Sequence, residues 1–201
     1  MARRQSRLGC EQAEHLLASF VAGLPARIAA ERVGVHRHTA RSHFHRLRTV
    51  IARELAHASA QAGWRDGVRF DLASLPVEHP RRRAFEPLFG LVVADHGVRV
   101  VRLLAVEGAA DEPPPDAIVG RESQAQGRRR LRIVQTNPVL GVERRRRLRA
   151  FWRSSVRHLS RFNGVPRQNL YLYLKECEWR FGSPTGVTLS TTLARWASVE
   201  D

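Results

Sequence analysis

The sequence has little cysteine, a single lysine and no long apolar run. Its two cysteines, Cys10 and Cys177, lie far apart and form no C-x-x-C pair, so neither a disulfide framework nor a zinc ribbon is predicted. No window approaches the roughly 18 apolar residues that a membrane span requires, and no apolar segment follows the arginines near Met1. We therefore expect a protein of the reducing cytoplasm that has no membrane partner.

Lysine is scarce because arginine supplies the positive charge. The 201 residues include 34 Lys and Arg against 19 Asp and Glu, which gives a formal net charge of +15, and Lys175 is the one lysine. Such an excess attracts polyanions, since each cationic side chain near a phosphate can release a condensed counterion. Nucleic acid is the expected partner class. The alternative is an arginine-rich composition on solvated surfaces.

The first 60 residues predict three helices, with breaks at Gly23-Leu24-Pro25 and Gly34-Val35. Small residues at Ala30 and Ala40 on either side of Gly34 are typical of the helix-turn-helix, whose second helix enters the major groove of DNA. The candidate DNA contacts are the outward residues of that second helix: Arg37, His38, Thr39, Arg41 and Ser42. An ordinary helical hairpin would give the same apolar spacing without binding DNA.

Residues 64–136 have a different pattern, which predicts a small sheet. The apolar runs rich in β-type residues are 68–75, 88–93, 98–106, 117–119 and 131–134. Asp95-His96-Gly97 predicts a hairpin turn between the second and third of these runs. Helices return from about Val142, with a break at Asn163-Gly164, and a last short helix is expected over 189–197. The expected fold class is α+β.

The run from Arg161-Phe162-Asn163-Gly164-Val165-Pro166 to Trp179-Arg180-Phe181 is similar to the end of a known catalytic domain. It resembles the short insertion-sequence DDE transposases of the ISXO-like group, which also have a pair like Phe151-Trp152. Residues from Phe20-Val21-Ala22-Gly23 to His45-Arg46-Leu47-Arg48 resemble that group's N-terminal helix-turn-helix. The resemblance implies a helix-turn-helix DNA-binding domain at 1–60. It also implies an RNase H-like transposase domain at 64–201, shortened in the middle.

The same resemblance implies three carboxylates around Mg²⁺ or Mn²⁺, which would assist phosphodiester chemistry. Position matching gives Asp71, Glu122 and Glu143 as catalytic candidates, with Asp71 and Glu143 as metal ligands. The third family carboxylate should precede Phe151-Trp152 by two residues, but Arg149 stands there. Glu143 lies further upstream, and the offset rotates it by about 240° on a continuous helix. It therefore fits only if the intervening arginines bulge or the helix starts later. Otherwise each acid is a solvated or ion-paired carboxylate.

Three functional hypotheses follow from these patterns. An active, nucleoid-associated transposase would bind double-stranded DNA at the terminal inverted repeats of its insertion sequence and cut and rejoin strands with Mg²⁺ or Mn²⁺. A catalytically inactive transposase-derived protein would bind DNA without cutting it and would need no metal, which Arg149 favours. A basic RNA-associated or structural protein would use the helix-turn-helix for packing alone. The sequence leaves the oligomeric state open, a homo-oligomer included.

Overall fold

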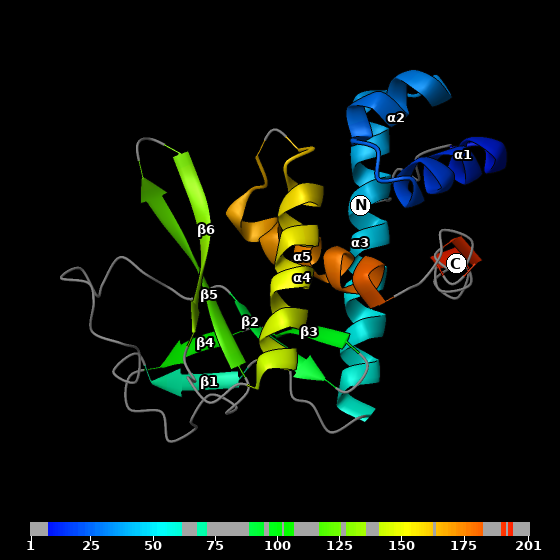
Figure 1. Ribbon diagram of the computed structural model, residues 1–201. Helices are drawn as coiled ribbons and strands as arrows, with labels where there is room; N and C mark the ends of the chain where they lie inside the picture. The colour runs from blue at the N-terminus through cyan, green and yellow to red at the C-terminus, as the bar shows by residue number, and fades with distance from the viewer. Residues whose placement is uncertain are drawn as a thin grey trace. The chain divides into compact units, whose positions relative to one another are not determined.

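The structure is a computed structural model in which helices account for most of the described residues. It describes residues 8–61, 68–71, 89–94, 97–101, 103–106, 117–125, 128–135, 141–162, 164–182, 190–191 and 193–194. The chain divides into two compact units. The first unit comprises Met1–Leu55 and Ser155–Asp201, and the second comprises Ala56–Ser154. Figure 1 labels the helices and strands of both units.

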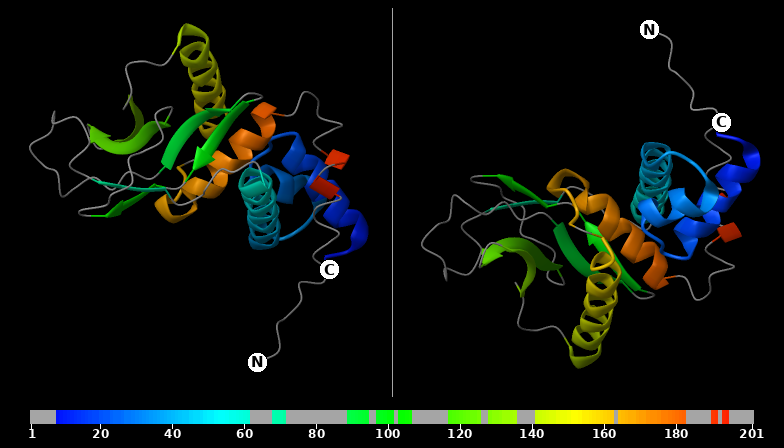
Figure 2. Two further views of the ribbon diagram at one scale, coloured as in Figure 1. Left: turned by 90° about the horizontal axis from the view of Figure 1, so that it is seen from below. Right: turned by 90° about the horizontal axis from the view of Figure 1, so that it is seen from above.

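Three helices open the chain, as the sequence predicts. They are α1 (Cys10–Val21), α2 (Ala26–Val33) and α3 (Arg37–Gln61). Both predicted breaks are confirmed, because Gly23 has φ 75° and Gly34 has φ 70°. This left-handed region suits glycine, which has no Cβ to clash with the backbone. In the three views of Figures 1 and 2, these helices, coloured blue to cyan, lie side by side.

Two further helices follow the strands. They are α4 (Val142–Leu159) and α5 (Leu170–Gly182), and a 3-10 turn over Arg167–Asn169 leads into α5. The break between them contains Gly164 with φ 91°, whereas Asn163 lies outside the described residues. In the predicted helix over 189–197, the four described residues are helical and the others lie outside the described part.

The C-terminal segment shares a core with the first three helices. Its buried residues are Leu16, Phe20, Ala29, Ala30, Ala40, Phe44, Leu47, Val50, Ile51, Trp179 and Leu193. The ring of Phe20 meets that of Phe44 edge to face, with centroids 5.1 Å apart, and lies 6.3 Å from the ring of Trp179. Full burial of a large apolar side chain stabilises a fold by about 1.5–3 kcal/mol. The unit is therefore held together by residues from both ends of the chain.

This division differs in one respect from the domains expected from the sequence. The sequence predicted a domain boundary at 60–64. The first unit ends nearby, at Leu55, and the second unit begins at Ala56. The other junction, at Ser154, falls inside α4 and was not indicated by any composition change. The first unit thus contains the C-terminal motif that resembles a transposase as well as the N-terminal helices.

Strands are found in the second unit. They are β1 (Val68–Asp71), β2 (Phe89–Ala94), β3 (Gly97–Val101), β4 (Leu103–Val106), β5 (Ala117–Ala125) and β6 (Arg128–Gln135). Four of them form an antiparallel sheet in the order β3-β2-β5-β6, and β1 pairs in parallel with β4. The predicted hairpin is confirmed by the pairing of Ala94 with Gly97, although its turn residues Asp95 and His96 lie outside the described residues.

Three strand predictions, the runs 98–106, 117–119 and 131–134, were wrong in their bounds. The run 98–106 forms two strands, β3 paired with β2 and β4 paired with β1, where one strand was expected. β5 and β6 pair from Ile118–Gln135 to Ala125–Arg128, well beyond their apolar residues, because backbone hydrogen bonds continue through polar positions. These pairings do not by themselves identify an RNase H-like domain, so that part of the fold stays a prediction. Among the described helices, none is long and apolar enough to span a membrane.

Candidate nucleic-acid interface

A tight turn joins α2 to α3. Gly34 ends α2 in the left-handed conformation, with φ 70° and ψ 32°. α3 begins at Arg37, where His36 Nδ1 accepts a hydrogen bond of 3.2 Å from the backbone N–H of His38. Such an acceptor satisfies one of the N–H groups that the first turn of a helix leaves unpaired. His36 therefore caps α3, a role that the sequence did not indicate.

The five candidate DNA contacts lie in the first two turns of α3. Arg37, His38, Arg41 and Ser42 are exposed, and Thr39 is half-buried. On its other side α3 buries Ala40, Phe44 and Leu47 in the core. Neither Arg37 nor Arg41 is paired with any residue that the structure describes. The first turns of α3 thus present cationic and hydrogen-bonding side chains to solvent. Whether these side chains contact DNA stays a prediction.

A pocket of about 470 Å³ opens beside Arg37 and Arg41, and we call it the arginine pocket. Its wall combines the first turn of α2, the start of α3 and the segment 161–173. Arg27 and Arg161 belong to this wall. The Arg27 side chain pairs with Glu31 at 2.7 Å, and Arg161 Nη1 donates to the Gly23 carbonyl oxygen at 3.4 Å. Residues far apart in the sequence therefore meet at the exposed end of α3.

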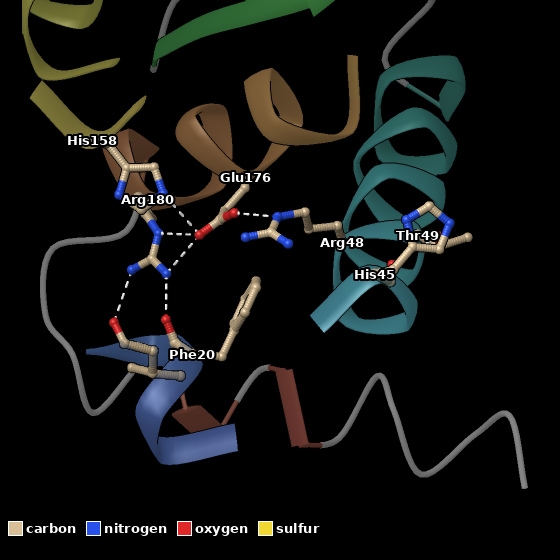
Figure 3. Close-up of polar contacts among 8 residues, drawn as sticks. Phe20, His45, Arg48, Thr49, His158, Glu176 and Arg180 are labelled. Atoms are coloured by element: carbon tan, nitrogen blue, oxygen red, sulfur yellow. Dashed lines mark hydrogen bonds and ion pairs between the residues drawn. The ribbon is translucent and has the colours of Figure 1, made fainter. Parts of the chain in front are cut away.

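A buried carboxylate on α5 ties this arrangement together. Glu176 is 1% exposed, and its Oε2 accepts a hydrogen bond of 2.7 Å from Arg48 Nε on α3. Its Oε1 accepts hydrogen bonds of 2.9 Å from His158 Nε2 on α4 and from Arg180 Nε. Figure 3 shows Glu176 between the Arg48 side chain on one side and His158 and Arg180 on the other. One carboxylate thus connects three helices.

The charge state of Glu176 follows from these contacts. Burial alone would raise the pKa of the carboxyl group. The hydrogen bond from His158 and the positive charges of Arg48 and Arg180 outweigh burial and lower the pKa from 4.5 to about 2. Glu176 is therefore ionised at neutral pH. The buried guanidinium group of Arg48 and the partly buried one of Arg180 therefore face a negative partner.

The two arginines make further contacts, Arg180 with α1 and Arg48 with an aromatic ring of α5. Arg180 donates from Nη1 to the carbonyl oxygen of Val21 at 2.8 Å and from Nη2 to that of Phe20. These carbonyls lie at the C-terminus of α1, where the helix dipole favours a cation. The Arg48 guanidinium lies 3.8 Å from the ring centroid of Tyr173, which lines the arginine pocket. The network therefore supports one wall of the pocket.

The three predicted catalytic carboxylates lie in the second unit. Glu143 is in the first turn of α4, with its side chain 67% exposed and 3.8 Å from Arg146. α4 is continuous, so residues 144–147 do not bulge. Asp71 ends β1 and Glu122 lies within β5, but the side chains of both lie outside the described part. Within that part, no three His, Cys, Asp or Glu residues could hold a metal ion. The described residues thus offer no divalent-metal site, and the catalytic roles stay predictions.

Sequence reasoning missed the residues that organise the first unit. Arg48 and Glu176 are separated by 128 positions, and no local pattern connects them. One signal was present in the sequence, because α5 carries charged residues next to the apolar Leu174 and Trp179. Charged side chains are rarely buried unless they are paired. A charged triplet at Lys175-Glu176 and Glu178 in an apolar helix therefore predicts buried ion pairs.

The chain shares a short region with a transposase-like protein. Over 33 residues it is 58% identical to an uncharacterized transposase-like protein of Haemophilus influenzae, which is 16% of this chain. The match spans 27% of the length of that protein. No protein-family profile matches the chain, and no solved structure matches it. The local similarity relates the chain to transposases without specifying a DDE or ISXO-like type.

Proposed function

We propose that the chain is a transposase-derived protein that binds double-stranded DNA through a helix-turn-helix formed by α2 and α3. The observation that carries the proposal is the pair of exposed arginines, Arg37 and Arg41, that follows the left-handed turn at Gly34. The similarity to a transposase-like protein supports a transposase-related function. The DNA partner that we propose is the terminal inverted repeats of an insertion sequence.

The chemistry of α3 suits the major groove. B-DNA admits an α-helix there, and residues near the N-terminus of that helix reach the base edges. Arg37 and Arg41 lie four positions apart and therefore on one side of α3. Arginine can donate two hydrogen bonds to a guanine edge or to a phosphate. His38, Thr39 and Ser42 add hydrogen-bonding groups in the same two turns.

Strand cutting is a separate proposal that the described residues support less well. It would need Asp71, Glu122 and Glu143 to converge on Mg²⁺ or Mn²⁺. The continuity of α4 keeps Glu143 on the same helix as Phe151 and leaves Arg149 at the position expected for the third carboxylate. A cation there would repel a divalent metal. DNA binding without strand cutting is therefore the function that we propose.

Binding to duplex DNA from either side of the coding sequence tests this proposal. We expect binding without added metal, and log K should fall linearly with log salt between about 50 and 200 mM, because each neutralised phosphate adds about −0.9 to the slope. Adding Mg²⁺ or Mn²⁺ should produce no nicks.

The control is an RNA duplex of the same sequence, which should bind more weakly. Salt-independent binding or equal affinity for RNA would contradict the proposal. Metal-dependent nicking that is lost in Asp71→Ala would establish an active transposase instead.

A further inference from the structure

The arginine pocket has two chemically different walls. Arg37 and Arg41 supply positive charge on the α3 side and have no partner among the described residues. Phe162 and Tyr173 lie on the side of the C-terminal segment, with ring centroids 5.0 Å apart in an edge-to-face pair. Ile28 of α2 adds a half-buried apolar side chain. The volume of about 470 Å³ falls within the roughly 300–1,000 Å³ of small-ligand pockets.

Two of the other arginines of the pocket, Arg48 and Arg27, contribute less free charge. Arg48 is neutralised by Glu176 at 2.7 Å, and Arg27 is paired with Glu31 at 2.7 Å. Arg161 donates to the Gly23 carbonyl oxygen. A neutral carbonyl oxygen leaves the charge of Arg161 in place, so an anion in the pocket would be held by Arg37 and Arg41 with the charge of Arg161 beside them.

An anionic group with an attached flat apolar group matches both walls. Phosphate suits the arginines, because guanidinium groups can donate two hydrogen bonds to it. A nucleobase suits aromatic side chains and guanidinium planes, on which unpaired bases stack. A base inside a duplex has no free face to offer, so a nucleotide that fills the pocket must be unpaired.

We propose that the arginine pocket binds one unpaired nucleotide of the DNA strand that passes α3. Arg37 and Arg41 bind its phosphate, and its base lies against Phe162 and Ile28. This inference rests on the proposed function, because the same arginines belong to the exposed turns of α3 and to the pocket wall. It assigns to segment 161–173 a direct part in DNA recognition. A free mononucleotide has the same chemistry, and it is the competing source of the ligand.

Fluorescence anisotropy with two DNAs separates the pocket from the helix-turn-helix. One DNA is a blunt duplex, and the other is the same duplex extended by unpaired nucleotides at one end. The wild-type protein should bind the extended DNA about tenfold more tightly, because stacking one base on an aromatic side chain has an effect of that order. A 2-aminopurine at the first unpaired position should lose fluorescence when the protein binds, which is a direct sign of stacking.

Two variants and a matched control test the walls of the pocket. Phe162→Leu should reduce the preference for extended DNA to less than threefold while leaving blunt-duplex affinity within twofold. Ile28→Glu places a carboxylate beside the phosphate and should abolish the preference even if the Phe162 variant folds poorly. The control is Val156→Glu, which makes the same apolar-to-acid change at a residue that is 47% exposed and does not line the pocket. That variant should keep the full preference.

The outcomes distinguish the pocket from the proposed function. If the wild-type protein binds both DNAs equally well and quenches no 2-aminopurine, the pocket inference is wrong and duplex binding stands. If it binds neither DNA, the proposed function fails as well. A mononucleotide that binds more tightly than the extended DNA would overturn a DNA strand as the source of the ligand.

Discussion

Replacing Glu176 by glutamine is expected to lower the free energy of unfolding by about 3–5 kcal/mol, because it leaves the buried guanidinium group of Arg48 and the partly buried one of Arg180 without a negative partner. The side chains of Arg48 and Glu176 are 5% and 1% exposed, so water cannot replace the lost carboxylate. Glutamine keeps the shape of the side chain, removes its charge and replaces one acceptor oxygen by an NH₂ donor. Urea denaturation of both proteins at neutral pH measures the difference.

A matched control for this substitution is Glu31→Gln. Glu31 pairs with Arg27 at the same distance of 2.7 Å, but their side chains are 59% and 57% exposed. Exposed ion pairs contribute about 0–1 kcal/mol, so this variant should unfold almost as the wild type does. Equal stability of the Glu176 and Glu31 variants would contradict the buried network.

The pH dependence of stability provides a second measurement on Glu176. Its pKa is lowered to about 2 in the folded protein, whereas an unfolded glutamate has a pKa near 4.3. Between these values the unfolded state binds more protons, so stability rises with pH. The stabilising effect of the carboxylate is therefore complete above about pH 4.5 and is lost as the pH falls toward 2. The stability difference between the wild type and Glu176→Gln should shrink over this range.

The double substitution Arg37→Gln with Arg41→Gln is expected to weaken duplex binding by about 10- to 100-fold. Each arginine that contacts a phosphate contributes about one unit to the salt slope, and each that reads a base contributes about 1–3 kcal/mol. If both contact phosphate, the slope should fall by about two units. Both side chains are exposed and unpaired among the described residues, so the fold should be unaffected. Anisotropy titrations at several salt concentrations measure both effects.

The control for the double substitution removes the same charge elsewhere on the first unit. Arg32 near the end of α2 and Arg157 near the end of α4 are exposed and do not line the arginine pocket. Arg32→Gln with Arg157→Gln should reduce affinity by less than threefold. If both double variants lose the same affinity, net charge rather than α3 determines binding, and the assignment of α3 to the interface is wrong.

The local parts of the fold could be predicted from the sequence. The α2–α3 turn depends on neighbouring residues, because Gly34 sets the backbone and Ala30 and Ala40 leave room for close packing. The break at Gly164 follows from the same glycine chemistry. The sequence pattern predicted helices up to about residue 60, and α3 ends at Gln61. Each of these features is determined by interactions over a few positions.

The long-range parts could not be predicted in this way. The packing of α5 against α1–α3 depends on contacts such as those of Glu176 with Arg48 and of Trp179 with Phe20. Apolar periodicity identifies a buried face but does not identify which helix covers it. The resemblance of segment 161–181 to the end of a catalytic domain favoured grouping it with the strands. The hydrogen bonds of Arg180 to α1 and the ion pair of Glu176 with Arg48 of α3 explain why this segment belongs to the first unit.

Hydrogen exchange of the backbone amides, measured with and without a bound duplex that is extended by unpaired nucleotides at one end, tests the central claim most directly. The DNA interface proposed for the first unit consists of the α2–α3 turn, the first turns of α3 and the segment after α4. DNA should therefore slow exchange at residues 34–42 and 161–166 and leave α1 unchanged. Slowed exchange confined to residues outside these two segments would contradict the account.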